Sequence, residues 1–165
     1  MTYKRRRKAI VGLLMVAAIL TTSSPANAHV LYQSGKPYQT NDNCVGSRAE
    51  VSHGVNNAGY YKADTTSWNA ISWAQCFATN YRPGGYIAVG QDFYRWSGAA
   101  WQVCGSQYWS YNQSSAYKVV TYHNAGRLTC LPGWYYTSAA SWVNFGSGWQ
   151  GGGITSGPTP HWIPA

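Results

Sequence analysis

Runs of aromatic and β-branched residues, separated by glycine-containing turns, fill the second half of the chain. Residues 86–89, 93–96 and 100–104 follow this pattern and predict a three-stranded meander, with Gly90 and Gly98 in its turns. Further short strands are predicted at residues 108–112, 117–123, 134–138 and 141–145. We therefore expect an all-β fold, a small antiparallel β-sandwich or barrel-like domain.

Helical spacing of apolar residues is weak throughout the chain. The one candidate helix is the segment 65–78, where a Thr or Ser cap precedes apolar residues that partly follow helical spacing. A single short helix there would leave the all-β class unchanged. Turns between strands are predicted at residues 56–57 and 124–126.

The first 28 residues have the pattern of a secretory signal peptide. Five basic residues at 4–8 precede an apolar run at about residues 9–20, and Ala26-Asn27-Ala28 follows. This apolar run is shorter than the ~20 residues needed to span a bilayer, so we expect no membrane span. The mature chain is predicted to begin at His29 and to be extracellular. Adjacent arginines leave both the general and the twin-arginine export routes open.

Four cysteines divide the predicted mature chain. An even number of cysteines in an exported chain predicts two disulfides, and no pair has the short spacing of a zinc site. Three pairings are possible, and all three remain open. The cysteines are Cys44, Cys76, Cys104 and Cys130. We expect a disulfide-bonded β domain at residues 44–145, an extended N-terminal arm at 29–43, and a Gly/Pro-rich C-terminal arm at 146–165 that packs on the domain or extends from it.

Net charge argues against nucleic acid as a partner. Five of the twelve Lys and Arg lie in the first 28 residues, which leaves seven against four carboxylates, a net charge of +3. These seven are spread singly along the sequence, whereas phosphate-backbone binding requires a clustered basic surface. A mild attraction to anionic cell-wall polymers remains open.

Catalytic motifs are missing from the sequence, so we expect a protein without enzymatic activity or cofactor. Glycoside hydrolysis needs two suitably spaced carboxylates, but Asp42 and Asp92 fall in predicted turns and Asp64 lies beside the predicted cap. Glu50 lies in a strand-like run and can pair with Arg48 on an exposed face. No Gly-x-Ser-x-Gly, His-Glu-x-x-His or phosphate-binding glycine loop occurs.

A histidine at the predicted mature N-terminus raises one metal-dependent alternative. Such a residue can bind copper through its α-amine and its imidazole, and in this placement His29 resembles the lytic polysaccharide monooxygenases and small copper-carrier sandwiches. A second ligand would have to be His53, His123 or His161. The resemblance implies a copper-dependent enzyme as an alternative function; otherwise we expect no metal.

The predicted mature chain contains 25 aromatic residues among its 137, more than a core of this size can bury. Exposed Trp and Tyr form platforms for sugar rings and hot spots in protein interfaces. Adjacent residues of a strand face opposite sides, so at least one of each adjacent set should point outward. The candidates for an aromatic binding surface are Tyr60, Tyr61, Tyr108, Trp109, Trp134, Tyr135, Tyr136 and Trp149.

An exported, two-disulfide, Trp/Tyr-rich β domain with a Gly-rich C-terminal arm is similar in outline to the small adaptor subunit of the umbrella toxin particles of filamentous soil bacteria. The resemblance implies partners, namely a repeat-bearing toxin stalk and a lectin-bearing subunit. It also implies that the N-terminal arm lies in a partner's groove. The arm residues concerned are His29, Val30, Leu31, Tyr32 and Tyr38.

The leading hypothesis is therefore a secreted, non-enzymatic binding or adaptor protein, within an antibacterial toxin complex if the resemblance holds. A carbohydrate or cell-wall binding module is one alternative, and it predicts exposed rings in one row. An inhibitor of a secreted enzyme is another, and it predicts a rigid disulfide-anchored loop.

Overall fold

The computed structural model describes residues 30–54, 59–72, 75–126, 130 and 132–164. Within these residues the chain forms two five-stranded antiparallel sheets. The first sheet contains β1 (Val30–Gln39), β2 (Asn43–His53), β3 (Gly59–Ser72), β4 (Gln75–Thr79) and β7 (Lys118–Gly126). The second contains β5 (Ile87–Trp96), β6 (Trp101–Tyr111), β8 (Gly133–Asn144), β9 (Trp149–Thr155) and β10 (His161–Ile163). The prediction of an all-β antiparallel fold is confirmed.

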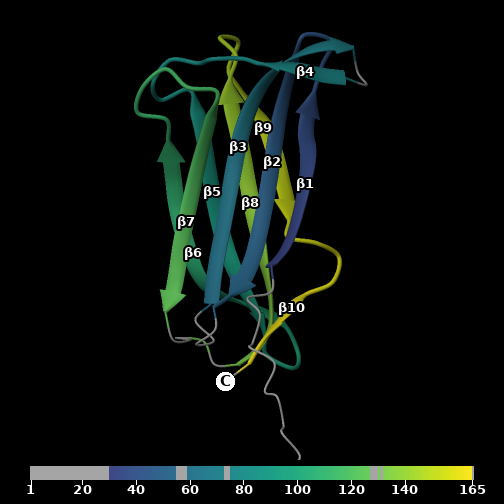
Figure 1. The fold of residues 1–165 in the computed structure, drawn as a ribbon, viewed down its shortest axis with the longest axis vertical. Helices are drawn as coiled ribbons and strands as arrows, with labels where there is room; N and C mark the ends of the chain where they lie inside the picture. Colours follow the sequence, from purple (N-terminus) through teal and green to yellow (C-terminus); the bar gives the residue numbers. More distant parts are fainter. Residues whose placement is uncertain (1–29, 55–58, 73–74, 127–129, 131, 165) are drawn as a thin grey trace, which may run out of the picture.

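The two sheets pack face to face as a sandwich (Figure 1). In the first sheet, β3 pairs with β2 on one side and with both β4 and β7 on the other. In the second, β8 pairs with β5 on one side and with both β9 and β10 on the other. Strand β1 lies beside β9, and β6 lies beside β7, so the sheets approach each other along both edges. No helix in the described part of the chain is long and apolar enough to cross a membrane.

Three pairs of short strands expected from the sequence are single long strands. Residues 86–89 and 93–96 join in β5, so that Gly90 and Asp92 lie within a strand and not in a turn. A Cβ at Gly90 would lie 3.4 Å from the ring of Trp109, so this ring packs directly over the glycine. Residues 134–138 and 141–145 join in β8, where Ala139 and Ala140 pair with β5. In the same way, 100–104 and 108–112 join in β6.

The candidate helix at residues 65–78 is wrong, because this segment forms the end of β3 and most of β4. Sheet packing explains the position of Trp68, whose indole lies over Gly46 on the neighbouring strand β2, where there is no side chain to displace it. Residues 124–126, predicted as a turn, belong to β7. The predicted turn at residues 56–57 lies outside the described residues.

Alternate residues of β2 and β8 point into the space between the sheets and form the core. At one end of the core three rings stack, with the centroid of Phe93 4.7 Å from those of Tyr61 and Tyr135. The rest of the core is built from small aliphatic side chains, which allow the sheets to pack closely. They include Val45, Ala49, Val51, Ala63, Ile87, Val89, Ala139, Val143 and Ile163.

Buried hydroxyl groups cross-link the two sheets through hydrogen bonds. Each donates from one sheet to an acceptor on the other, so these hydroxyl groups are satisfied and the sheets are held in one register. The bonds run from Thr65 to the Ala88 carbonyl (2.8 Å), from Thr137 to the Glu50 carbonyl (2.8 Å), and from Ser141 to the Ser47 hydroxyl (2.6 Å).

The disulfide pairing left open by the sequence is Cys44–Cys76 and Cys104–Cys130. The first bond ties β4 to the start of β2, and the second ties β6 to the segment between β7 and β8. Two disulfides in a small all-β domain are consistent with an extracellular protein.

The described part of the extended N-terminal arm predicted at 29–43 lies along the β domain. Val30–Gln39 forms β1 and pairs with β2 along its length. Thr40 turns the chain back, its hydroxyl accepting a bond from the Asn43 amide (3.1 Å). Leu31 then packs against the core, and Tyr38 stacks on Phe145. Leu31 and Tyr38 are therefore core contacts of this chain.

The C-terminal segment packs on the domain. Both β9 and β10 pair with β8, and Ile163 is fully buried in the core. Glycines in this segment permit close approach, since the Cβ position of Gly152 lies 3.1 Å from Pro37 of β1. The segment is therefore an integral part of the second sheet.

The stacked tyrosines make the fold sensitive to alkaline pH. Burial raises the pKa of Tyr61 and Tyr135 above the ordinary value of 10.0. Below pH 10 these tyrosines are neutral in both the folded and the unfolded chain. Above pH 10 the tyrosines of the unfolded chain lose their protons first, so the free energy of unfolding should fall as pH rises. We expect the Tm to fall between pH 9 and pH 11.5, and to fall less in Tyr61→Phe. Tyr108→Phe is the control, because Tyr108 is 87% exposed; equal slopes in all three proteins would contradict the expectation.

Candidate binding surfaces

The outer side of the second sheet is built from the residues of β5 that alternate with its core positions. They are Ala88, Gly90, Asp92, Tyr94 and Trp96, so aromatic side chains stand at one end and small or polar ones at the middle and the other end. The neighbouring strands β6 and β8 place their own outward residues beside them. We call this outer side the aromatic face.

At the β10 end of the aromatic face, rings from four strands form a cluster of four and a neighbouring pair. Tyr94 of β5 stacks on Tyr136 of β8 (4.8 Å between centroids), and Trp101 of β6 meets Tyr136 edge-on (4.7 Å). Trp96 contacts Trp101 (5.4 Å). Beside them, Trp134 of β8 meets Trp162 of β10 edge-on (5.2 Å). Each of the four tryptophans remains more than a third exposed.

At the opposite end, two pairs of rings stand on either side of a low floor. Trp109 and Tyr111 rise from β6, and Trp142 and Trp149 rise from β8 and β9. Tyr111 and Trp149 approach edge-on, with centroids 6.1 Å apart. The floor between the pairs is Ala88, which is buried beneath the rings.

Polar groups occupy the middle of the aromatic face. The Ser106 hydroxyl donates to Asp92 Oδ1 (2.6 Å), and the Tyr94 hydroxyl donates to Asp92 Oδ2 (3.5 Å). Burial, and then the Asp92 charge, raise the pKa of Tyr94 and Tyr136, which therefore remain neutral hydrogen-bonding groups. Ser138 of β8 lies beside Asp92.

Three hollows follow one another along the aromatic face. One of about 210 Å³ lies over Ala88 between the rings of Trp109, Tyr111, Trp142 and Trp149. A second, of about 250 Å³, includes Gly90, Asp92, Ser106, Ser138 and Ala140. A third, of about 410 Å³, lies between Trp96, Trp101, Trp134 and the loop residues Thr159 and Pro160. Trp109 borders the first two hollows, so they are continuous at its ring.

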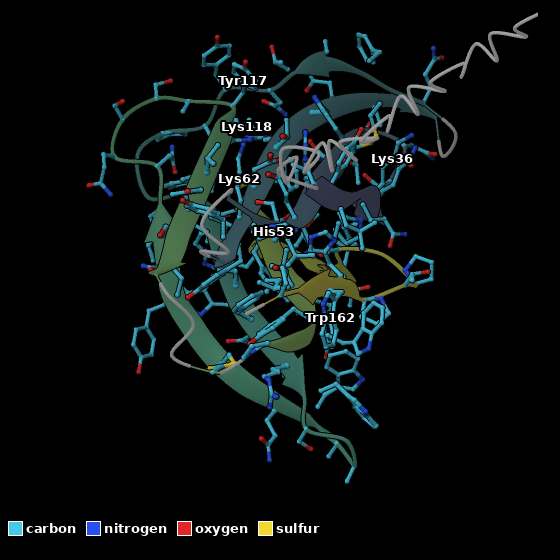
Figure 2. The ribbon with its side chains drawn as sticks, turned by 60° about the horizontal axis from the view of Figure 1, so that its bottom comes forward. Lys36, His53, Lys62, Tyr117, Lys118 and Trp162 are labelled. Carbon is cyan, nitrogen blue, oxygen red and sulfur yellow. A yellow bond between two sulfur atoms is a disulfide. The ribbon has the colours of Figure 1, made fainter. Side chains whose placement is uncertain are left out.

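The outer side of the first sheet has a different character, and we call it the charged face. All three lysines that follow residue 28 lie on its strands. Figure 2 shows Lys36, Lys62 and Lys118 over the strands of the first sheet, with Trp162 away from them toward the second. Lys36 and Lys62 form no ion pair with another described residue.

Two ion pairs lie on the charged face. Arg48 bonds to Glu50 (2.9 Å), as the sequence suggested, and its guanidinium lies 4.0 Å from the ring centroid of Tyr32. Lys118 pairs with Asp64 across β7 and β3 (3.0 Å). A shallow hollow of about 340 Å³ opens here, and its lining includes Lys36, Arg48, Asp64, Trp68 and Lys118.

The predicted aromatic surface residues divide between the core and both faces. Tyr61 and Tyr135 are buried, so their prediction as surface residues is wrong: each points inward while its neighbour points outward. Tyr60 is half-buried on the charged face, where it stacks on Tyr122 (5.8 Å). The residues that do reach the aromatic face are Tyr108, Trp109, Trp134, Tyr136 and Trp149.

The sequence interpretation missed six rings of the aromatic face, one of which is Tyr111 of β6. Alternation would have found some of them, because Tyr94 and Trp96 share one side of β5 with Gly90, and Trp142 shares one side of β8 with Trp134. Because β5 and β8 were each predicted as two short strands, the alternation along the whole strand was not apparent. Trp162 and Trp101 could be placed only once β10 and β6 were paired with their neighbours.

Two of the described histidines, His53 and His161, contact each other. The rings of His53 and His161 lie 5.2 Å apart, joining the end of β2 to β10 (His53 and Trp162, the neighbour of His161, are labelled in Figure 2). The described part of the chain contains no group of three or more His, Cys, Asp or Glu that could hold a metal ion. His29 and the side chain of His123 lie outside the described residues, so the copper site stays a prediction.

Comparison of the chain with protein-family profiles, with curated proteins and with solved structures finds no match.

Proposed function

We propose that the protein is a secreted, non-enzymatic adaptor that binds one partner through the charged face and a second ligand through the aromatic face. The observation that carries this proposal is the opposite character of the two faces. One presents the lysines, while the other presents exposed rings and has no lysine on any of its strands. Two surfaces of different chemistry on one small domain suit two different binding partners.

The rigidity of the sandwich supports a linking role. The hydroxyl bonds between the sheets hold the faces at a constant separation, while the disulfides tie β4 to β2 within the first sheet and β6 to the segment between β7 and β8. Three of the four carboxylates, moreover, already have partners: Glu50 pairs with Arg48, Asp64 with Lys118, and Asp92 accepts from Ser106. These contacts assign structural roles to groups that an acid–base catalyst would use.

The signal-peptide pattern and the outline resemblance to the umbrella toxin adaptor suggest the setting in which both faces are used. In such a particle the protein would join a repeat-bearing toxin stalk to a lectin-bearing subunit. The resemblance implies that residues 29–43 lie in a partner's groove. Because β1 is a strand of the first sheet, we expect Val30 and Tyr32 to contact that partner as exposed residues of the charged face, and not as part of a free arm.

The test is a co-purification in which each face is altered separately. Tagged protein is recovered from culture supernatant of the source organism, and the proteins that accompany it are identified by mass spectrometry. Lys36→Glu with Lys62→Glu should reduce recovery of the charged-face partner at least tenfold, because two positive charges become negative and the net charge of this face falls by four units. Lys36→Arg with Lys62→Arg keeps the charge and should retain that partner.

The adaptor proposal requires that the faces act independently. The charge-reversal protein should still bind the ligand of the aromatic face and should be folded at the temperature of the assay, since both lysines are surface residues. Its Tm should be somewhat lower than that of the wild type, because Lys62→Glu places a carboxylate directly opposite Glu50 on β2. Recovery of the wild-type protein alone, or equal recovery of every partner by the charge-reversal and charge-retaining variants, would contradict the proposal.

A further inference from the structure

The three hollows lie in a row along the aromatic face, and together we call them the groove. The row follows β5 from Ala88 to Trp96, eight residue steps that span ~27 Å at the rise of a strand. Ala88 and Gly90 on β5, with Ala140 on β8, keep the floor low at one end and in the middle. Rings stand on both sides of the floor at Ala88, Tyr108 and Trp109 line the middle, and the stacked Tyr94 and Tyr136 stand between the middle and the hollow at Trp96. The groove therefore fits an extended chain better than a compact molecule.

The walls and the floor of the groove differ in what they can bind. Flat rings offer apolar surfaces that match the C–H face of a pyranose. In the middle, Asp92, Ser106 and Ser138 offer hydrogen-bonding oxygens that match its hydroxyl rim. Among the described residues, no Leu, Ile or Met lines any of the three hollows, although such side chains would be expected in a groove for an apolar peptide.

The charges in and near the groove favour a neutral polysaccharide over an anionic one. Asp92 is the charged side chain that lines the groove, and it would repel a uronate or phosphate polymer. Arg95, the one cation on the strands of the second sheet, is held by its two bonds to the Pro132 carbonyl (3.2 and 2.9 Å). The three lysines and Arg48 lie on the charged face, on the opposite side of the sandwich.

We infer that the aromatic face is a binding groove for a neutral polysaccharide chain, which lies along β5 with its sugar rings against the tryptophans. The inference names the ligand of one face and so rests on the proposed function for that face. It does not depend on the identity of the charged-face partner.

Retention of the purified protein on insoluble neutral polysaccharides, cellulose and chitin, tests the inference. We expect the wild-type protein to be retained on at least one of them and released by its soluble oligosaccharide. Trp101→Ala and Trp142→Ala should each weaken retention about tenfold, one from each end of the groove. Trp142→Phe, which keeps a ring, should lose less than Trp142→Ala.

A blocking variant and a matched control separate a shaped groove from general adhesiveness. Ala140→Arg keeps every ring but raises the floor, and it should reduce retention as much as Trp142→Ala. Tyr122→Ala removes an exposed ring from the charged face and should leave retention unchanged. Circular dichroism and the Tm establish that each variant is folded.

Three outcomes would overturn the inference: no retention of the wild-type protein on either polysaccharide, equal retention of Ala140→Arg, or stronger retention on the anionic polymer alginate than on both neutral ones. If retention fails while the lysine-dependent partner is still captured from the supernatant, the ligand assigned here is wrong and the adaptor role stands. If the polysaccharide is bound and no protein partner is captured, the adaptor role is wrong and the groove stands.

Discussion

Replacement of Phe93 by Ala is expected to lower the free energy of unfolding by about 3–5 kcal/mol. The Phe93 ring is 1% exposed and is stacked between Tyr61 of the first sheet and Tyr135 of the second. Its removal takes away the contacts of both tyrosines and leaves a cavity that their rigid rings cannot fill. Equilibrium unfolding in guanidinium chloride, followed by tryptophan fluorescence, measures the loss.

Phe93→Leu is the matched control for this prediction. It retains most of the apolar volume and should cost clearly less than Phe93→Ala, because the cavity is smaller. Phe93 points into the core and touches neither face of the sandwich. A folded Phe93→Ala protein should therefore keep its binding properties below the unfolding transition. A loss of less than 1.5 kcal/mol, on the order of a volume-conserving change, would show that the ring stack is not a principal part of the core.

Removal of the Cys104–Cys130 disulfide is the second change with a large expected effect. The bond closes a loop with a sequence separation of 26, and the loss of that constraint on the unfolded chain should lower stability by about 3.5 kcal/mol. Cys104→Ser combined with Cys130→Ser avoids an unpaired thiol. Denaturant unfolding of this double variant without reductant, compared with the wild type, measures the effect.

The second disulfide supplies the comparison. The Cys44–Cys76 bond closes a loop of similar length, with a separation of 32, so its removal should cost nearly the same in the loop-entropy account. Removal of Cys104–Cys130 should in addition loosen β6, the strand that carries Trp101 and Trp109. Variants that lose less than about 1 kcal/mol would show that the sheets, and not the cross-links, determine stability.

The core and the aromatic face are linked because successive residues of a strand point to opposite sides of the sheet. Every second residue of β5 and β8 builds the core, and the residues between them build the aromatic face. Core and binding surface therefore share the same strands, so the backbone that positions the tryptophans is held by Phe93, Tyr135 and their neighbours. A binding surface on paired strands needs little ordering when a ligand arrives, which favours affinity.

The sequence by itself determined the class of the fold. Runs of aromatic and β-branched residues with glycine and asparagine between them fit a pleated, half-buried surface, and this local preference is readable without any partner strand. The even number of cysteines likewise predicted two disulfides. Their pairing was decided by tertiary structure, because only strand pairing brings Cys44 beside Cys76 and Cys104 beside Cys130.

Tertiary structure also decided which residues form strands and which rings are exposed. Gly90 and Ala140 look like strand breaks in the sequence, yet they pair with each other in the middle of the second sheet and lower the floor of the groove. Tyr135 and Tyr136 are the same residue type, but the register of β8 directs Tyr135 into the core and Tyr136 onto the aromatic face. Residues 30–39 read as a polar arm because they contribute few core side chains; backbone pairing with β2, which leaves no pattern in the sequence, makes them a strand.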